Sequence, residues 1–159
     1  MAEEKSWIDW DRAERFISGL RTISASDTPL WAVFVHHAHH SNFFKWTIGK
    51  NNHFGFKRTA RQSKVIKVVR DGEAHEFSDW DTPEEAMAFY LEVVSRNHPE
   101  ALKCARCSHC YLWGIRDWNA EGDRAGRSYF RELTRKHRFL QGEDRLVEMF
   151  KKHLDYTEI

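Results

Sequence analysis

The stretch that decides the fold is Trp31 to Lys57, WAVFVHHAHHSNFFKWTIGKNNHFGFK. It begins with apolar residues, places four histidines within five positions, and ends in a turn that contains two asparagines. Asp27-Thr28-Pro29, just before it, is a helix-start signal, because proline suits the first helical turn. From Ser41 to Gly55, glycine, asparagine and polar residues interrupt every periodicity. We therefore expect a helix that ends near residue 40, followed by loop and short turns.

This expected helix has one apolar face, on which the residues recur at helical spacing. The face consists of Leu30, Val33, Phe34, His37 and Ala38, whereas His36, His39 and His40 lie off it. The plain interpretation is that His37 faces the core and the other histidines are polar groove or surface residues.

The preceding and following segments have signals of their own. Ser6 and Asp9 fit a helix start of capping-box type, with Asp in place of the usual Glu. KVIKVVR and EAHEFSDW are two strand-like runs joined by Asp71-Gly72, a strong hairpin signal. Thr82-Pro83-Glu84-Glu85 opens the next helix as a capping box. Trp113 to Gly126 reads as an irregular connection, and residues 129–138 and 143–154 as two closing helices.

Composition limits the class of protein. The 159 residues are 41% hydrophobic and 14% aromatic, so the chain should form a core of its own. The chain contains no run of about 18 apolar residues, so no membrane span is predicted. The N-terminus lacks the apolar stretch of a signal peptide, and three closely spaced cysteines do not suit a disulfide framework. We expect a cytoplasmic protein.

Nucleic acid is not an expected partner. The net charge is +1, so the chain as a whole has no strong field. Basic residues do follow one another along the chain, at Lys57, Arg58, Arg61, Lys64, Lys67 and Arg70. On a hairpin they would alternate between faces and lie opposite the acidic run from Glu73 to Asp81, whereas a nucleic-acid surface needs them on one face.

The order of these elements, with NNHFGFK at Asn51 to Lys57 and FSDWDTPEEAMAFY at Phe77 to Tyr90, resembles the glucosaminidase domain family. These are lysozyme-like enzymes of bacterial autolysins, flagellar rod-cap proteins and phages, and they cut the glycan strands of peptidoglycan. The resemblance runs from about Phe16 to Leu154. It implies one domain over residues 1–159 of α+β class, mainly helical, with a β-hairpin lobe beside a cleft. A Cys-containing insertion at about residues 99–127 departs from the family pattern.

The resemblance also implies a catalytic glutamate at the end of the second helix, where this chain has histidine. Counting back from Asn51, the position falls on His40, or on His39 if the loop differs by one residue. No Asp or Glu lies between Leu30 and Ile66, and the reaction needs a carboxylic acid with a raised pKa. Asp79 is a candidate second carboxylate, unless the hairpin acids form a solvated edge. The expected sugar-binding residues are Phe43, Trp46, Asn51, Asn52, Phe54, Trp80 and Tyr90.

Two groups of residues could hold metal. His36 and His40 have the i, i+4 spacing of zinc ligands on a helix, His39 is close enough to join them, and metal-bound water could replace the glutamate. Cys104, Cys107, His109 and Cys110 form C-x2-C-x-H-C, which suits a structural zinc. His98 or a histidine of the 36–40 group could be the fourth ligand instead of His109. Three small buried thiols are the alternative.

Two functions follow. The first is a catalytically impaired, glucosaminidase-like domain that binds peptidoglycan-type glycan through aromatic residues. Phage origin, with release at lysis or carriage in the virion, would account for a missing signal peptide. The second is a pseudoenzyme that binds a protein partner, with a zinc-stabilised insertion as its surface. A metal-assisted hydrolase that uses the histidines is a further alternative.

Overall fold

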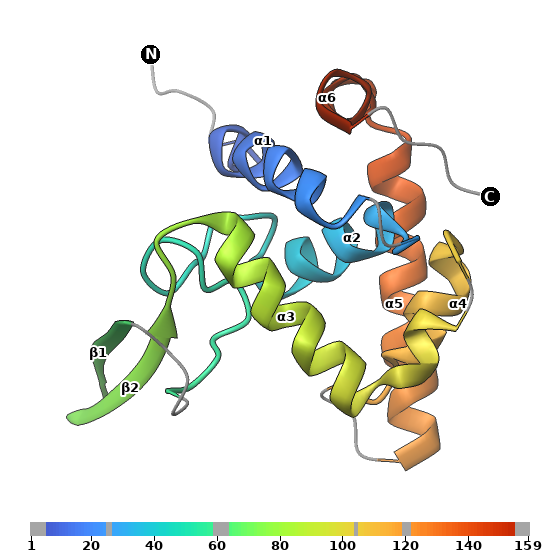
Figure 1. Ribbon diagram of the computed structural model, residues 1–159. Coiled ribbons are helices and arrows are strands. Elements are labelled where there is room, and N and C mark those ends of the chain that lie inside the picture. Colours follow the sequence, from blue (N-terminus) through green and yellow to red (C-terminus); the bar gives the residue numbers. More distant parts are fainter. Residues whose placement is uncertain (1–5, 25–26, 59–63, 104, 119–121, 155–159) are drawn as a thin grey trace.

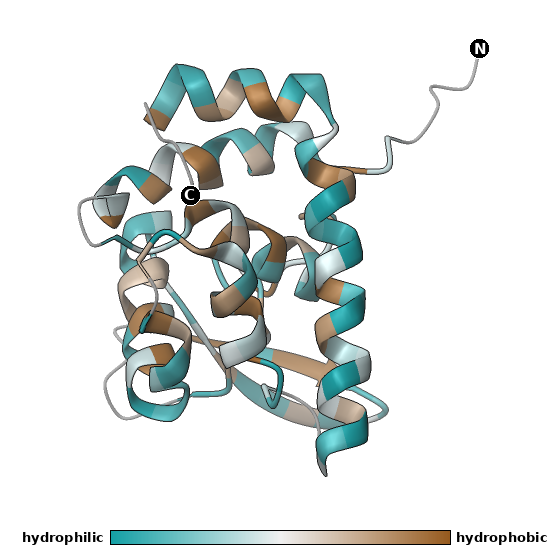
Figure 2. Cartoon of the chain, turned by 90° about the vertical axis from the view of Figure 1, so that its right-hand side faces the viewer, coloured by the Kyte–Doolittle hydropathy of each residue, from teal (hydrophilic) through white to brown (hydrophobic). Residues whose placement is uncertain are grey.

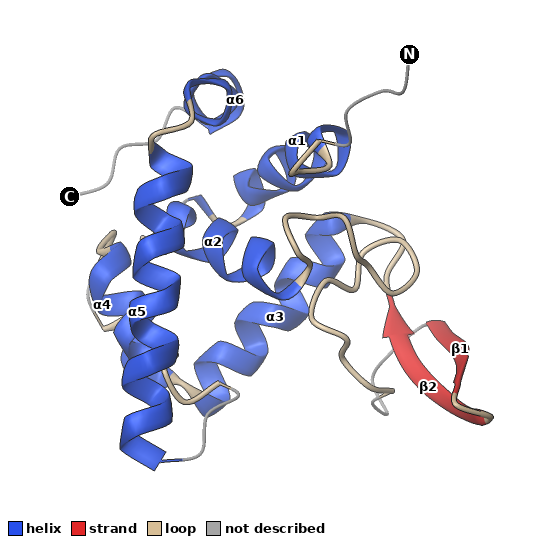
Figure 3. Ribbon diagram, turned by 180° about the vertical axis from the view of Figure 1, so that it is seen from behind, coloured by secondary structure: helices blue, strands red, loops and turns tan. Residues whose placement is uncertain are grey.

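A buried helix occupies the centre of the fold. The structure is a computed structural model that describes residues 6–24, 27–58, 64–103, 105–118 and 122–154. Helix α2 (Leu30–His40) lies in the middle of the helical body, and the other helices surround it (Figures 1 and 3). All residues from Leu30 to Ala38 are buried, so this helix has no solvent-facing side until its last turn.

The surrounding helices are α1 (Trp10–Gly19) with the 3-10 turn η1 (Leu20–Thr22), α3 (Pro83–Asn97), the 3-10 turn η3 (Pro99–Leu102), α4 (Ser108–Gly114), α5 (Gly122–Gln141) and α6 (Asp144–Leu154). The predicted helices occur in the expected order, and two helical segments that the sequence does not predict, η3 and α4, lie between α3 and α5. Hydrophilic and hydrophobic residues alternate along the outer helices, which turn their apolar sides inward (Figure 2). Among the described helices, none is both long enough and apolar enough to cross a membrane.

Two helix starts differ from the prediction. Asp9 is itself the N-cap of α1, and its Oδ1 accepts a hydrogen bond from the Arg12 amide at 3.1 Å. Ser6 instead accepts from the Ile8 amide at 3.3 Å, so the predicted capping box was wrong. Helix α5 begins at Gly122, seven residues before the predicted start at residue 129. Glycines suggested a loop there, but Gly126 lies inside the helix, where it packs beside Arg116.

Other local signals are confirmed. The side chain of Thr82 caps α3 by accepting from the Glu85 amide at 3.3 Å, and Pro83 occupies the first turn. Asp71 and Gly72 have positive φ angles of 50° and 78°, as a two-residue hairpin turn requires. They join β1 (Lys64–Arg70) to β2 (Glu73–Asp79) in one antiparallel pair.

The hairpin projects away from the helical body (Figure 1). A further segment, residues 56–58, lies along the second edge of β2. There the Arg58 amide donates to the Glu76 carbonyl at 3.1 Å, and the Ser78 amide donates to the Phe56 carbonyl at 3.0 Å. Strand β2 therefore has backbone partners on both sides.

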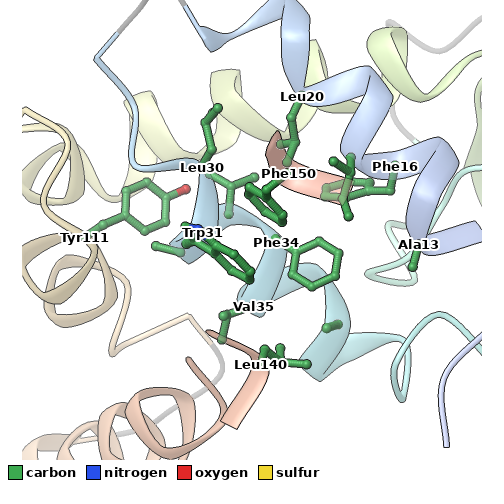
Figure 4. Packing of buried hydrophobic residues seen from close by; sticks show 14 of the residues in the cluster. Ala13, Phe16, Leu20, Leu30, Trp31, Phe34, Val35, Tyr111, Leu140 and Phe150 are labelled. Carbon is green, nitrogen blue, oxygen red and sulfur yellow. The ribbon is translucent and has the colours of Figure 1, made fainter. Parts of the chain in front are cut away.

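Aromatic rings pack together with aliphatic side chains in the core (Figure 4). Trp31 of α2 stacks on Phe150 of α6, with ring centroids 3.8 Å apart and planes 3° from parallel. Phe34 packs edge-on against Phe150 and also touches Phe16 of α1. Burial of such rings dominates core energetics, so α2 is fixed by contacts with helices from both ends of the chain.

Candidate functional site

The candidate site begins at the turn that ends α2. The Ser41 hydroxyl donates to the His37 carbonyl at 2.7 Å and accepts from the Phe44 amide at 2.9 Å. Asn42, Phe43 and Phe44 follow with φ angles of 49°, 56° and 65°, in the left-handed region that is unfavourable for aromatic residues. Burial of the Phe44 ring against Phe34 holds this conformation. The turn reverses the chain, so that Trp46 lies beyond the helix end.

The two asparagines of NNHFGFK attach the loop to the hairpin. Asn52 donates through Nδ2 to the carbonyls of Phe56 and Ser78 at 2.9 and 2.8 Å, and its Oδ1 accepts from the Phe56 amide at 2.9 Å. Asn51 donates to the Trp80 carbonyl at 2.8 Å. Both side chains are buried, so they build the turn in this conformation instead of facing a ligand.

Asp79 has a similar structural role. Its carboxylate accepts hydrogen bonds from the Lys50 amide at 3.1 and 3.2 Å and from the Asn51 amide at 3.0 Å. The residue is only 4% exposed. Gly49 has a φ of 60°, and a Cβ there would lie 2.5 Å from the Asp79 carboxylate, so glycine is needed at this position. Contrary to the expected second catalytic carboxylate, Asp79 lies beneath the loop and holds it.

The expected sugar-binding residues fall into two groups. Trp80 and Tyr90 are buried like the two asparagines, and the Tyr90 hydroxyl lies 2.7 Å from His36 Nδ1 and 2.6 Å from the Tyr111 hydroxyl. The other three residues, Phe43, Trp46 and Phe54, reach the surface in part. Phe43 packs against Trp7, with ring centroids 5.3 Å apart.

Trp46 and Phe54 line a cavity of about 350 Å³ between the loop and the hairpin, which we call the hairpin pocket. Its lining residues are Trp46, Phe54, Gly55, Lys57, Arg70, His75 and Phe77. Trp46 is 40% exposed there. The Phe54 ring also lies 4.8 Å from the His40 ring, centroid to centroid. Phe54 therefore connects the hairpin pocket to the end of α2.

At the end of α2, helix α5 supplies the polar partners. His40 Nε2 lies 2.8 Å from the Tyr129 hydroxyl, and Lys136 Nζ donates to His39 Nδ1 at 2.7 Å. Glu132 lies 3.6 Å from the same lysine and 3.9 Å from His39. Residues 129, 132 and 136 share one side of a helix, and this spacing is the only signal in the sequence that could have identified them.

The histidines at the helix end are uncharged near neutral pH. Burial, followed by the charges of His39 and Lys136, lowers the pKa of His40 to about 3. Burial also lowers the pKa of His39, with Lys136 adding to the effect. Burial raises the pKa of Tyr129 well above its usual range, so the hydroxyl keeps its proton. A neutral imidazole is a weak proton donor, so neither histidine matches a carboxylic acid in this role.

The structure does not assemble the predicted metal site on α2. His36 is fully buried, and its ring packs edge-on against His40 with centroids 5.0 Å apart. In the described part of the chain, no group of three or more His, Cys, Asp or Glu side chains is placed to hold a metal ion. The pair of histidines therefore has no third ligand there.

The cysteine motif lies partly outside the described residues, since Cys104 is not among them. Cys107 is the N-cap of α4, and its Sγ accepts from the Cys110 amide at 3.3 Å. His109 packs edge-on against Phe130, with ring centroids 5.2 Å apart. Zinc binding by Cys104, Cys107, His109 and Cys110 stays a prediction.

The first prediction concerns the Asn52 hydrogen bonds. Asn52→Ala removes three of them and leaves buried backbone groups without partners, so we expect a loss of about 2–4 kcal/mol in the free energy of unfolding. Urea denaturation measures it. Asn97→Ala removes an exposed asparagine at the end of α3 and should change stability by less than about 0.5 kcal/mol. Equal effects of the two substitutions would contradict the structural role of Asn52.

The second prediction concerns pH. Burial lowers the pKa of His53 to about 4, whereas an unfolded histidine has a pKa of about 6.5. Because the unfolded state then binds more protons, stability is full above about pH 6.5 and falls as the pH drops toward 4, by up to about 1.4 kcal/mol per pH unit for each such residue. His36, His37 and His40 act in the same direction.

Urea denaturation at pH 7, 6 and 5 measures this slope. His53→Gln should reduce it. A free energy of unfolding that does not vary over this range would show that the folded and unfolded states bind the same number of protons, which contradicts lowered pKa values of the buried histidines.

No protein-family model and no curated protein sequence matches the chain. Solved structures do match. The glycoside hydrolase domain of FlgJ from Salmonella typhimurium is 20% identical with a TM-score of 0.65, and the match covers 90% of this chain and 98% of that domain.

A peptidoglycan hydrolase from Sphingomonas sp. A1 is 17% identical with a TM-score of 0.56, over 92% of this chain and 98% of that chain. A mutant of a peptidoglycan hydrolase from the same organism gives a TM-score of 0.58 at 18% identity, over 91% of this chain and 99% of that one. At these identities the likeness concerns the fold. The chain thus has the mainly helical fold with a β-hairpin of the FlgJ glycoside hydrolase domain, as its sequence predicts.

Proposed function

We propose that this domain binds peptidoglycan-type glycan strands and that its hydrolytic site is impaired. The observation that carries the proposal is the hairpin pocket, an aromatic cavity next to the end of α2, on a fold shared with peptidoglycan hydrolases. Ligand pockets combine apolar and aromatic walls with a few polar groups, and this cavity has that character.

Binding rests on the aromatic side chains that remain accessible. Trp46 is 40% exposed, and Phe54 is half-buried beside it. A sugar ring has an apolar face formed by C–H groups, which packs on an aromatic ring and excludes water from both. The strained turn after Ser41 and the hydrogen bonds of Asn52 fix the loop that carries both rings. The pocket is thus built before a ligand arrives, which lowers the entropic cost of binding.

Impaired hydrolysis rests on the polar groups at the helix end. Cleavage of a glycosidic bond needs an acid that protonates the leaving oxygen and a carboxylate that supports the developing positive charge. His40 is neutral and bonded to Tyr129, and Asp79 is occupied by backbone amides. Glu132 is the carboxylate beside His39, and Lys136 lies 3.6 Å from it.

One observation favours a second function, the binding of a protein partner at α4. A cavity of about 480 Å³ there has a mainly apolar wall, lined by Glu100, Lys103, His109, Cys110, Trp113, Gly114 and Phe130. Trp113 is 41% exposed. Exposed apolar surface of this kind often marks protein contacts, and all of its lining residues except Phe130 fall within residues 99–127, where the sequence predicts an insertion.

A matched pair of tryptophan substitutions separates the two functions. Trp46→Ala should weaken cosedimentation with purified peptidoglycan by about tenfold, because one buried aromatic contact contributes on the order of 1–3 kcal/mol. Trp113→Ala removes a tryptophan of similar exposure outside the pocket and should bind like the wild type. If Trp113→Ala loses binding and Trp46→Ala retains it, the hairpin pocket is not the glycan site.

The hydrolytic deficit is tested by restoring the acid. We expect the wild type to release no reducing ends from purified peptidoglycan above background. His40→Glu places a carboxyl group among Phe54 and Tyr129, where partial burial raises its pKa toward that of a general acid. This variant should release reducing ends, and His40→Gln, its uncharged counterpart, should not. Turnover by the wild type would refute the proposed impairment.

A further inference from the structure

The hairpin pocket carries positive charge as well as aromatic rings. Strand register explains why, because side chains directly opposite one another in a sheet share a face. Lys57 pairs with Phe77, and His75 lies two residues before Phe77 on β2, so all three turn to the same side. Arg70, opposite Glu73, completes this side at the tip of the hairpin. Three of the lining residues are thus basic, and none is acidic.

The cations of the pocket differ from their neighbours on the hairpin. Arg58 pairs with Glu76 at 2.9 Å and Lys64 pairs with Asp81, both outside the pocket. For Lys57 and Arg70, no carboxylate of the described residues lies within ion-pair distance. Glu73 is the nearest acid along the strand. Its side chain is 81% exposed and lies 3.9 Å from His75, and an ion pair this exposed contributes little.

Arg70 is also held in place. Its guanidinium lies 5.4 Å from the ring centroid of Trp46, within the range of a cation–π contact. The contact brings a planar, permanently charged donor next to the most exposed ring of the pocket. A guanidinium binds carboxylates through two parallel hydrogen bonds. The pocket therefore joins a surface for a sugar ring to a group that recognises an anion.

We propose that the hairpin pocket binds a sugar unit that bears a free carboxylate. This inference rests on the proposed glycan binding and names the unit of the strand that the pocket selects. The sugar ring packs on Trp46 and Phe54, and the carboxylate is bound by Arg70 and Lys57. The volume of about 350 Å³ is near the lower end for ligand pockets and suits one sugar unit. The net charge of the chain is only +1, so attraction of the carboxylate depends on the basic residues of the pocket itself.

Three ligands of related structure test the proposal. The first is the neutral tetramer of N-acetylglucosamine. The second is a peptide-free peptidoglycan strand, in which every second sugar carries a lactyl carboxylate. The third is the same strand with its carboxylates converted to methyl esters. Binding is measured by titration calorimetry with the wild type, Arg70→Gln, Lys57→Gln and Lys67→Gln. Lys67 is exposed on the same strand as Arg70 but on its other face, so Lys67→Gln is the control with an equal charge change.

We expect the free-acid strand to bind about threefold to tenfold more tightly than the ester and the neutral tetramer, as for a charge-assisted hydrogen bond at a half-exposed site. Arg70→Gln and Lys57→Gln should each reduce this preference, Lys67→Gln should preserve it, and added salt should weaken only the free-acid complex. Equal binding of all three ligands by the wild type would overturn this inference and leave glycan binding intact. No binding of any ligand would overturn both proposals.

Discussion

Helix α2 carries two histidines into a core that water does not reach, and the arrangement of the site follows from how these imidazoles are accommodated. A buried polar group is costly without a hydrogen bond. His37 meets this requirement within its own helix, where its Nδ1 lies 2.9 Å from the Val33 carbonyl. His36 requires Tyr90, which in turn contacts Tyr111. In this way α2, α3 and α4 are joined by polar contacts as well as by apolar packing.

The hairpin pocket depends on a second constraint, the attachment of an irregular loop to β2. Phe44 anchors the start of this loop in the core, and Asn52 and Asp79 supply the hydrogen bonds that regular structure would otherwise provide. With the loop held in this way, Trp46 is 40% exposed, and Phe54 is half-buried and packed against Tyr90. Rigid placement of a few aromatic rings by buried polar groups is a common basis of ligand sites.

Local signals in the sequence predicted the elements well and the site only in part. The apolar period of α2, the Asp71-Gly72 turn and the Thr82 cap each depend on residues close together in the chain. The role of Asn52 depends on a partner 26 residues away, and that of His40 on a partner 89 residues away. Asn51, Asn52, Trp80 and Tyr90 were expected to bind sugar because they lie in the two motifs that resemble the glucosaminidase family. The same residue types also build a buried turn, and only tertiary contacts decide between the two.

The pairing of residues 56–58 with β2 has a consequence for the behaviour of the protein in solution. With β2 occupied on both sides, β1 is the outer strand of the hairpin, and Val65 and Val69 are 40% and 70% exposed on it. An apolar outer strand is a template for pairing with a second chain. Lys67 lies between these valines on the same face, Lys64 and Arg70 lie on the other face, and the three charges repel an identical strand. The basic residues of β1 thus oppose edge-to-edge pairing, which limits how far this strand can be made neutral by evolution or by design.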